Sequence, residues 1–183
     1  MVVLLPAMLM AGNVIINEVS TGHGTWLELK NTGSTPVNIG GWTISNSGGS
    51  DVLPDFTIQP AGYAVIAASR SQTADIYMED GSIGSGLSTT GDMLVLADAK
   101  GRVVDQLNWG KALSSWANFS TGLWSQGPTM PTDGSLCRIP DALDRDLPND
   151  FREITEATPG AENMYVGGLD TPSWGKIKAL FSK

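Results

Sequence analysis

The sequence is poor in the residues that most often carry covalent or metal chemistry. Its 183 residues include one cysteine, Cys137, and one histidine, His23. A lone cysteine cannot close an internal disulfide bond, and any Ser-His-Asp or Cys-His mechanism would have to use His23. The Gly-x-Ser-x-Gly motif is also absent. We therefore predict no catalytic residues, no cofactor and no enzymatic activity. A hydrolase built on Asp and Glu pairs is the alternative.

Basic residues are scarce as well. Eleven Lys and Arg stand against nineteen Asp and Glu, which gives a net charge of −8 and a pI near 4.4. A protein that binds nucleic acid through phosphates needs a basic face to neutralise them. We therefore do not expect nucleic acid as a partner.

No apolar run is long enough to cross a bilayer as a helix. The longest, Met1–Ala11, is uncharged but falls far short of the ~20 residues that such a helix needs. It has the length of the apolar part of a secretory signal peptide, without the basic residues that usually precede it. We interpret residues 1–12 as a possible signal peptide, and we expect an extracellular or cell-envelope location. A first strand or an apolar leader is the alternative.

Helical periodicity is missing up to residue 163, whereas short β-rich segments and turns are frequent. The chain has 22 Gly and 10 Pro, and its length suits one domain. The clearest stretch is Val14–Ile44, where two extended segments are joined by a glycine-containing turn and a third follows a Gly-Gly pair. There we expect Trp42 in the core. Further hairpins are predicted from Phe56–Ile58 with Tyr63–Ala67 and from Met93–Ala97 with Val103–Trp109, and a last strand from Leu136–Ile139.

The order of these segments resembles that of a known family. INEV, WLELKN and VNIGGWTIS are followed by FTIQPAGYAVIA, GDMLVL, GRVVDQL, GSLCR and TPGAEN. Together they are similar to lamin tail domains, of the type found in secreted bacterial proteins. The resemblance implies an all-β, immunoglobulin-like β-sandwich over residues 14–163. The nuclear filament role of the best-known members is not implied, because the chain has neither heptads nor a basic localisation run.

The segment Lys111–Gly134 is the candidate contact surface. It is the least strand-like internal stretch and carries three aromatic residues, Trp116, Phe119 and Trp124. Loops on a rigid sandwich often carry binding function, and exposed aromatic side chains are good anchors. The alternative is that both tryptophans cap the end of the core.

Polar residues in the strands and an acidic run have simpler interpretations. Asn17 and Asp105 fall at the phase of inward-facing neighbours, so we expect both to be hydrogen-bonded as part of the scaffold. From Asp141 to Glu156 there are six acidic residues. Within this stretch, Asp141–Asp150 could bind calcium, but the spacing does not match a calcium loop and Arg145 interrupts it. We predict a solvated acidic loop and no metal ligands.

The chain after residue 163 differs from the acidic body. Residues 164–183 consist of a short linker and a basic end with Lys176, Lys178 and Lys183. Four apolar residues recur there at helical spacing, namely Trp174, Ile177, Leu180 and Phe181. This tail is expected to contact a partner or a membrane surface, or else to pack on the domain.

Together these features predict a non-enzymatic binding or adhesion module that is secreted or displayed on the cell surface. Its partner would be a protein or a glycan. The alternative is an accessory or targeting domain that serves an extracellular hydrolase or nuclease. The fold alone does not identify the ligand.

Overall fold

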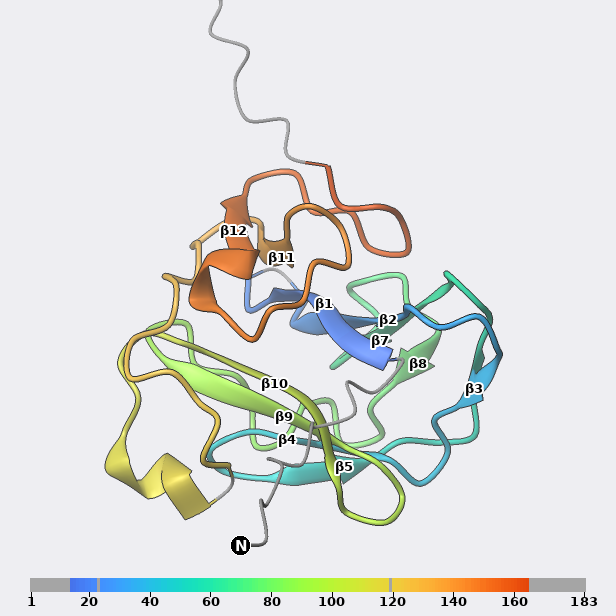
Figure 1. The fold of residues 1–183 in the computed structure, drawn as a ribbon, viewed down its shortest axis with the longest axis horizontal. Helices are drawn as coiled ribbons and strands as arrows, with labels where there is room; N and C mark the ends of the chain where they lie inside the picture. Colours follow the sequence, from blue (N-terminus) through green and yellow to red (C-terminus); the bar gives the residue numbers. More distant parts are fainter. Residues whose placement is uncertain (1–13, 23, 119, 165–183) are drawn as a thin grey trace, which may run out of the picture.

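The computed structural model describes residues 14–22, 24–118 and 120–164, and β-strands dominate this part of the chain (Figure 1). The described helices are two short 3₁₀ turns, η1 (Ser114–Asn118) and η2 (Pro148–Asp150). In this part, no helix is long and apolar enough to cross a bilayer. The predictions for residues 1–12, for His23 and Phe119, and for the tail beyond residue 164 lie outside the described residues.

The described residues form two sheets and a small strand pair. The larger sheet has the order β12-β11-β1-β2-β7-β8, and only its β7–β8 pair is parallel. Its strands are β1 (Val14–Ser20), β2 (Trp26–Asn31), β7 (Tyr63–Ala67), β8 (Ile76–Tyr77), β11 (Ser135–Arg138) and β12 (Phe151–Ile154). The smaller sheet has the order β10-β9-β4-β5. It consists of β4 (Thr43–Ser45), β5 (Ser50–Val52), β9 (Asp92–Ala97) and β10 (Val103–Trp109), while β3 (Val37–Asn38) pairs with β6 (Thr57–Ile58).

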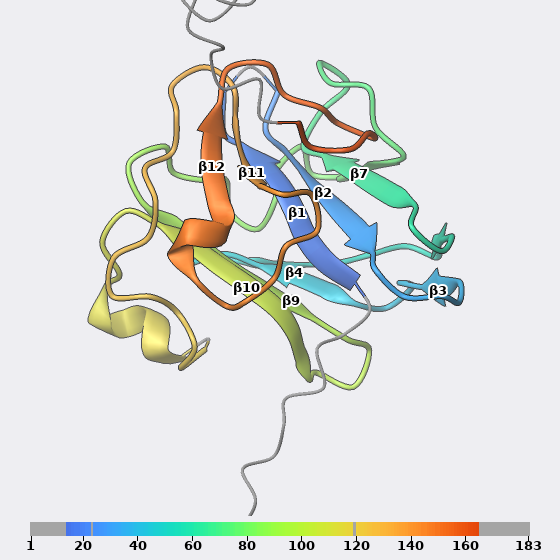
Figure 2. The same ribbon diagram turned by 45° about the horizontal axis from the view of Figure 1, so that its top comes forward.

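The core lies between the two sheets. Alternate residues of each strand face it, as period-two patterning requires. Leu27 and Leu29 of β2 and Leu94 and Leu96 of β9 are fully buried in one apolar cluster. Trp42 was expected in the core, but it is only half-buried and packs against this cluster from outside. The fold is an immunoglobulin-like β-sandwich (Figures 1 and 2).

Two of the predicted hairpins are confirmed and one is wrong. β1 pairs with β2, and β9 pairs with β10. The turn at Gln59–Gly62 exists, with the Gly62 amide donating to the Gln59 carbonyl at 2.9 Å. However, β6 before it pairs with β3, and β7 after it pairs with β2. The chain therefore changes ladder at this turn instead of folding back on itself.

Three strands were not predicted, and one of them is the two-residue β8, which is parallel to β7 at an edge of the larger sheet. The polar stretch after Trp42 contains β5, an edge strand of the smaller sheet. The acidic run contains β12, which pairs with β11 and follows the strand that was predicted to be the last. All three strands lie at a sheet edge and have two to four residues without regular alternation, so local hydrophobicity marks them weakly.

A β-bulge sets which polar side chains of β1 leave the core. The pairing with β2 shifts register between Ile16 and Glu18, so Asn17 is an extra residue. Val14, Ile16 and Val19 therefore belong to the core cluster. Asn17 was expected to share the inward phase of Val19, but the bulge interrupts that phase, and Glu18 comes to lie opposite Glu28 of β2.

The outer face of the larger sheet is covered as well. The chain that follows β12, orange to red, returns over β1 and β2 (Figures 1 and 2). Its amides at Thr158 and Gly160 bond to side chains of those two strands. As a result every residue of β1 is buried, which is unusual for a strand of a two-sheet sandwich.

Candidate functional site

Arg138 of β11 is the centre of a buried charge cluster. Its Nη2 donates to both carboxylate oxygens of Asp105, at 3.0 and 3.2 Å, and its Nη1 donates to Asp144 at 3.0 Å. Its Nε donates to the carbonyl of Ile16 at 2.9 Å, and its guanidinium stacks 4.6 Å from the ring centroid of Phe151. The Arg138 side chain is only 2% exposed. All its donor nitrogens therefore face fixed partners.

Asp105 completes this cluster from β10. It accepts the Ile16 amide at 2.6 Å and the Gln106 amide at 2.7 Å. Burial raises the pKa of Asp105 to about 6, while the positive charge of Arg138 acts to lower it. Asp105 is therefore ionised at neutral pH and paired with Arg138. This confirms the expectation that Asp105 is hydrogen-bonded scaffold.

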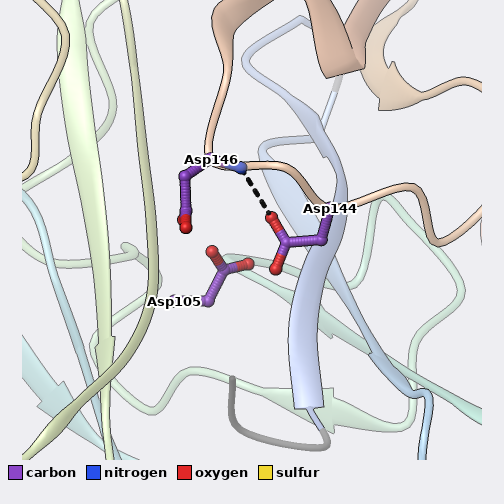
Figure 3. A group of neighbouring side chains, drawn as sticks. All are labelled: Asp105, Asp144 and Asp146. Carbon is purple, nitrogen blue, oxygen red and sulfur yellow. Dashed lines mark hydrogen bonds between the residues drawn. The ribbon is translucent and has the colours of Figure 1, made fainter. Parts of the chain in front are cut away.

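The acidic run contributes two more carboxylates here. Figure 3 shows Asp105, Asp144 and Asp146 with their carboxyl groups turned toward one another, and one oxygen of each lies within 4.8 Å of the others. Arg138 already supplies the positive charge between Asp105 and Asp144. Asp105 and Asp144 thus belong to an arginine-centred ion-pair cluster, which differs from the oxygen cage that calcium requires.

The acidic run is not the solvated loop that we predicted. Asp150 has no exposed surface and accepts the Arg145 and Leu147 amides at 2.7 and 3.2 Å. Asp141 is 7% exposed and pairs with Lys30 of β2. The backbone amides of this irregular segment have no partners in a sheet or helix, and acidic side chains of the run accept their hydrogen bonds instead. These bonds explain why a stretch with few apolar residues is ordered.

A second polar cluster lies under the covering segment on the outer face. Glu18 and Glu28 are neighbours on β1 and β2, and both are fully buried. Glu18 accepts the hydroxyl of Ser135, and also the amide and hydroxyl of Thr158 at 3.1 and 3.2 Å. Glu28 accepts the Asn17 side-chain amide at 2.8 Å and the Gly160 amide at 2.6 Å.

These bonds define a latch, residues 158–163, that closes over the two glutamates. Asn163 secures its end, donating from Nδ2 to the Asn17 carbonyl at 3.1 Å and accepting the Thr158 hydroxyl at 2.8 Å. The TPGAEN segment thus supplies backbone and side-chain donors to carboxylates on β1 and β2. Sequence reasoning missed this role, because it depends on two strands whose glutamates become neighbours only through the bulge.

Electrostatics in the latch region favour protonation of one glutamate. Burial raises the pKa of Glu28 to about 8, although the bonds from Asn17 and Gly160 lower it. Burial also raises the pKa of Glu18. Burial would raise the pKa of Asp141 too, but its bonds to Lys30 and Asn17 hold that pKa below its usual value. Each oxygen of Glu18 and Glu28 already accepts a protein donor, so neither carboxyl group presents an open position to a substrate.

Cys137 is buried on this same face. Burial raises the pKa of its thiol to about 12, and the nearby Glu18 carboxylate adds to the effect. A thiol in this state is a poor nucleophile, because the thiolate is the reactive form.

The aromatic loop is mainly structural. Trp116 is buried against Met93 and Val95, so it is not the exposed anchor that we expected. Trp124 is half-buried, lies 6.1 Å from Phe151 between ring centroids, and donates from Nε1 to the Asp146 carbonyl at 3.0 Å. Asn108 clamps the Trp124 backbone with bonds of 2.8 and 3.0 Å. Trp124 thus packs against the core cluster, as the alternative interpretation expected. Trp116 does not cap the core, because it belongs to a separate cluster with Met93 and Val95 on the other face of β9.

A different surface is open. A groove of about 520 Å³, here called the edge groove, is lined by residues 51–54 and 77–80. Its lining residues belong to or directly follow β5 and β8, and each of these strands is at one edge of its sheet. Val52 is 69% exposed there, beside the partly buried Tyr77 and Met78. Asp51, Glu79 and Asp80 make this apolar groove acidic. Sequence reasoning did not single out this surface, and the valine that follows the polar residues 45–51 was its only signal in the sequence.

The family follows from a comparison of the sequence with family models. The lamin tail domain model matches residues 10–111, which is more than half of the chain. The chain belongs to the lamin tail domain family. A search of curated proteins gives no match. The region that matches the family model includes β1 to β10 and both segments that line the edge groove.

Proposed function

We propose that the chain is a non-enzymatic binding module and that the edge groove holds a segment of a protein partner. The observation that carries the proposal is Val52, 69% exposed on an edge strand beside an acidic groove. The buried carboxylates described above are committed to Arg138 and to the latch, so they support a scaffold and not an active site.

The backbone of β5 favours an extended ligand. Asn46 bonds to Gly49 and Leu53 bonds to Trp42, both through backbone atoms. Because hydrogen-bonded pairs alternate along an antiparallel ladder, the N–H and C=O of Val52 point away from β4. A peptide segment can add to such an edge as a further strand.

The side chains of the groove specify the chemistry of that segment. Leu53, Pro54 and Met78 provide an apolar floor, and three carboxylates surround it. An apolar segment with Lys or Arg therefore fits, whereas phosphates of a nucleic acid are repelled. A protein fits better than a glycan, because the guanidinium of Arg70 already stacks on the Tyr77 ring, 4.7 Å from its centroid.

We propose that this is a lamin tail protein of the secreted bacterial type, active outside the cell or in the cell envelope, on the strength of the apolar residues 1–12. The alternative is an accessory domain of an extracellular hydrolase or nuclease. In that case the same groove would bind a segment of the enzyme. Assays of hydrolase and nuclease activity, with and without divalent metal, test the absence of catalysis.

A selection from a phage-displayed random peptide library on the full chain tests the binding role. We expect enriched peptides that combine apolar residues with Lys or Arg, and that bind at least about tenfold more weakly to the Val52→Asp variant. Leu113→Asp is the matched control, because Leu113 is 59% exposed and lies away from the groove. Enrichment that Val52→Asp does not affect, or no enrichment, contradicts the proposal.

A further inference from the structure

The chain contains a segment whose chemistry complements the edge groove. Residues 173–183 hold three of the eleven Lys and Arg residues and no acid. The rest of their side chains include Trp174, Ile177, Leu180 and Phe181. The groove has the opposite charge, with three carboxylates around an apolar floor.

We propose that residues 173–183 occupy the edge groove of their own molecule and compete there with the outside partner. This inference rests on the proposed binding role of the groove and adds its regulation. Lys176 and Lys178 pair with the carboxylates of the groove, and the apolar residues of the segment cover Val52 and Met78. A segment of a partner protein can bind in the groove only when it displaces the tail.

The carboxylates are placed to receive basic residues. Asp51 accepts the Gly84 amide and Asp80 accepts the Ser82 amide at 3.0 Å, which fixes both side chains at the groove. Glu79 and Asp80 are exposed. Preorganised carboxylates lose little side-chain entropy when a lysine arrives, so most of the attraction is retained.

The tail is long enough to reach the groove. Asn163 is held on β1 by its bond to the Asn17 carbonyl. β8 lies three strands away in the order β1-β2-β7-β8, which is about 15 Å at the usual strand spacing, and the depth of the sandwich adds ~10 Å. The ten residues from 165 to 174 span up to about 33 Å when extended. The path therefore needs no change in the domain.

Attachment makes even a weak contact effective. A short flexible linker gives an effective concentration of about 1 mM. An intrinsic Kd near 0.1 mM for the free segment would then leave the groove occupied by the tail about ten times as often as empty, and outside ligands would bind about tenfold more weakly.

Binding of a fluorescein-labelled peptide of residues 173–183 tests the inference, with every protein used as the full chain. In a variant with Leu180→Asp and Phe181→Asp, the attached tail no longer competes. We expect the peptide to bind this variant about tenfold more tightly than it binds the wild type. Adding Val52→Asp should abolish that binding, and adding Leu113→Asp should not.

A charge exchange provides the second test. Glu79→Lys with Asp80→Lys should weaken binding of the peptide to the tail variant, and a peptide carrying Lys176→Glu and Lys178→Glu should recover it. Far-UV circular dichroism checks that each variant folds. Equal binding to the wild type and the tail variant, or binding that ignores Val52, overturns the inference. A dimer that depends on the tail in analytical ultracentrifugation also overturns it. If library-selected peptides bind through Val52 while the tail peptide does not, only this inference fails and the proposed function stands.

Discussion

At the scale of single residues, Arg138 carries the largest expected effect. It is the partner of Asp105, and both side chains are 2% exposed. Replacement by Met keeps much of the volume but leaves a buried carboxylate without its cation. We expect Arg138→Met to lower the free energy of unfolding by about 3–5 kcal/mol, measured by urea denaturation.

Two further variants isolate the cause. Arg102→Met removes an arginine that is 75% exposed and paired with Asp98, and should leave the urea midpoint unchanged. Adding Asp105→Asn to Arg138→Met should restore part of the loss, because the unpaired charge is gone. If the double variant is no more stable than Arg138→Met, lost packing is the cause and the ion-pair explanation is wrong.

Glu28 makes stability depend on pH. Its pKa is about 8 in the folded chain against an ordinary value of 4.5. The folded state therefore holds the proton more tightly, and the stabilisation is complete below pH 4.5, falls as pH rises, and is lost above pH 8. The slope reaches about 1.4 kcal/mol per pH unit at most.

Replacing Glu28 by Gln tests this dependence. Glu28→Gln should flatten the curve of unfolding free energy against pH between 5 and 8, with a residual slope from Glu18 and Asp105, whose pKa values burial also raises. Urea denaturation at several pH values measures it. The exposed Glu153→Gln is the control. A variant that keeps the full slope of the wild type would rule out Glu28 as its source.

Single residues were predictable where regular alternation held. Asp105 falls at the phase of Leu107 on β10, and the structure places it inside with bonded partners. Asn17 and Glu18 were not predictable, because the bulge at Asn17 changes the phase and no residue type near it indicates a bulge. Trp116 and Trp124 looked like surface anchors because burial of a loop depends on contacts far away in the sequence.

At the scale of elements, the latch is the least expected component, and Asn163 tests it. Its side chain is 4% exposed and bonds to both Asn17 and Thr158. We expect Asn163→Ala to lower the free energy of unfolding by about 1–3 kcal/mol, since the Asn17 carbonyl loses a buried donor. Hydrogen exchange should also speed up at the Thr158 and Gly160 amides.

The neighbouring Glu162 is the control for this experiment. It is exposed, so Glu162→Ala should change neither stability nor exchange. Equal melting temperatures for both variants would show that the latch covers the glutamates without stabilising the fold.

Hairpins were the elements that the sequence predicted best. β9 and β10 are long, apolar and joined by a short turn, so local information specifies their pairing. β5 and β12 have three and four residues. Their pairing depends on a neighbouring strand rather than on their own composition, which is why they were read as loops. β6 shows the same limit, since its turn was predicted and its partner was not.

At the scale of the whole molecule, the sandwich extends beyond the family match. The match ends at residue 111, whereas β11 and β12 complete the larger sheet beside β1. Leu136 and Phe151 from these strands belong to the core cluster. The later part of the chain also supplies Arg138 and the latch, so it neutralises or covers the acidic residues of the matched part.

A chain that ends at residue 111 should therefore not fold. It would expose one edge of β1, remove Leu136 and Phe151 from the core, and leave Asp105 without Arg138. The unpaired buried charge alone costs about 3–5 kcal/mol, a large share of the 5–15 kcal/mol that stabilises a typical domain. We expect residues 14–111 to give a collapsed amide spectrum by NMR and no cooperative urea transition, and residues 14–164 to give a dispersed spectrum and a single transition. A dispersed spectrum from residues 14–111 would show instead that β11, β12 and the latch are additions to a sandwich that is complete without them.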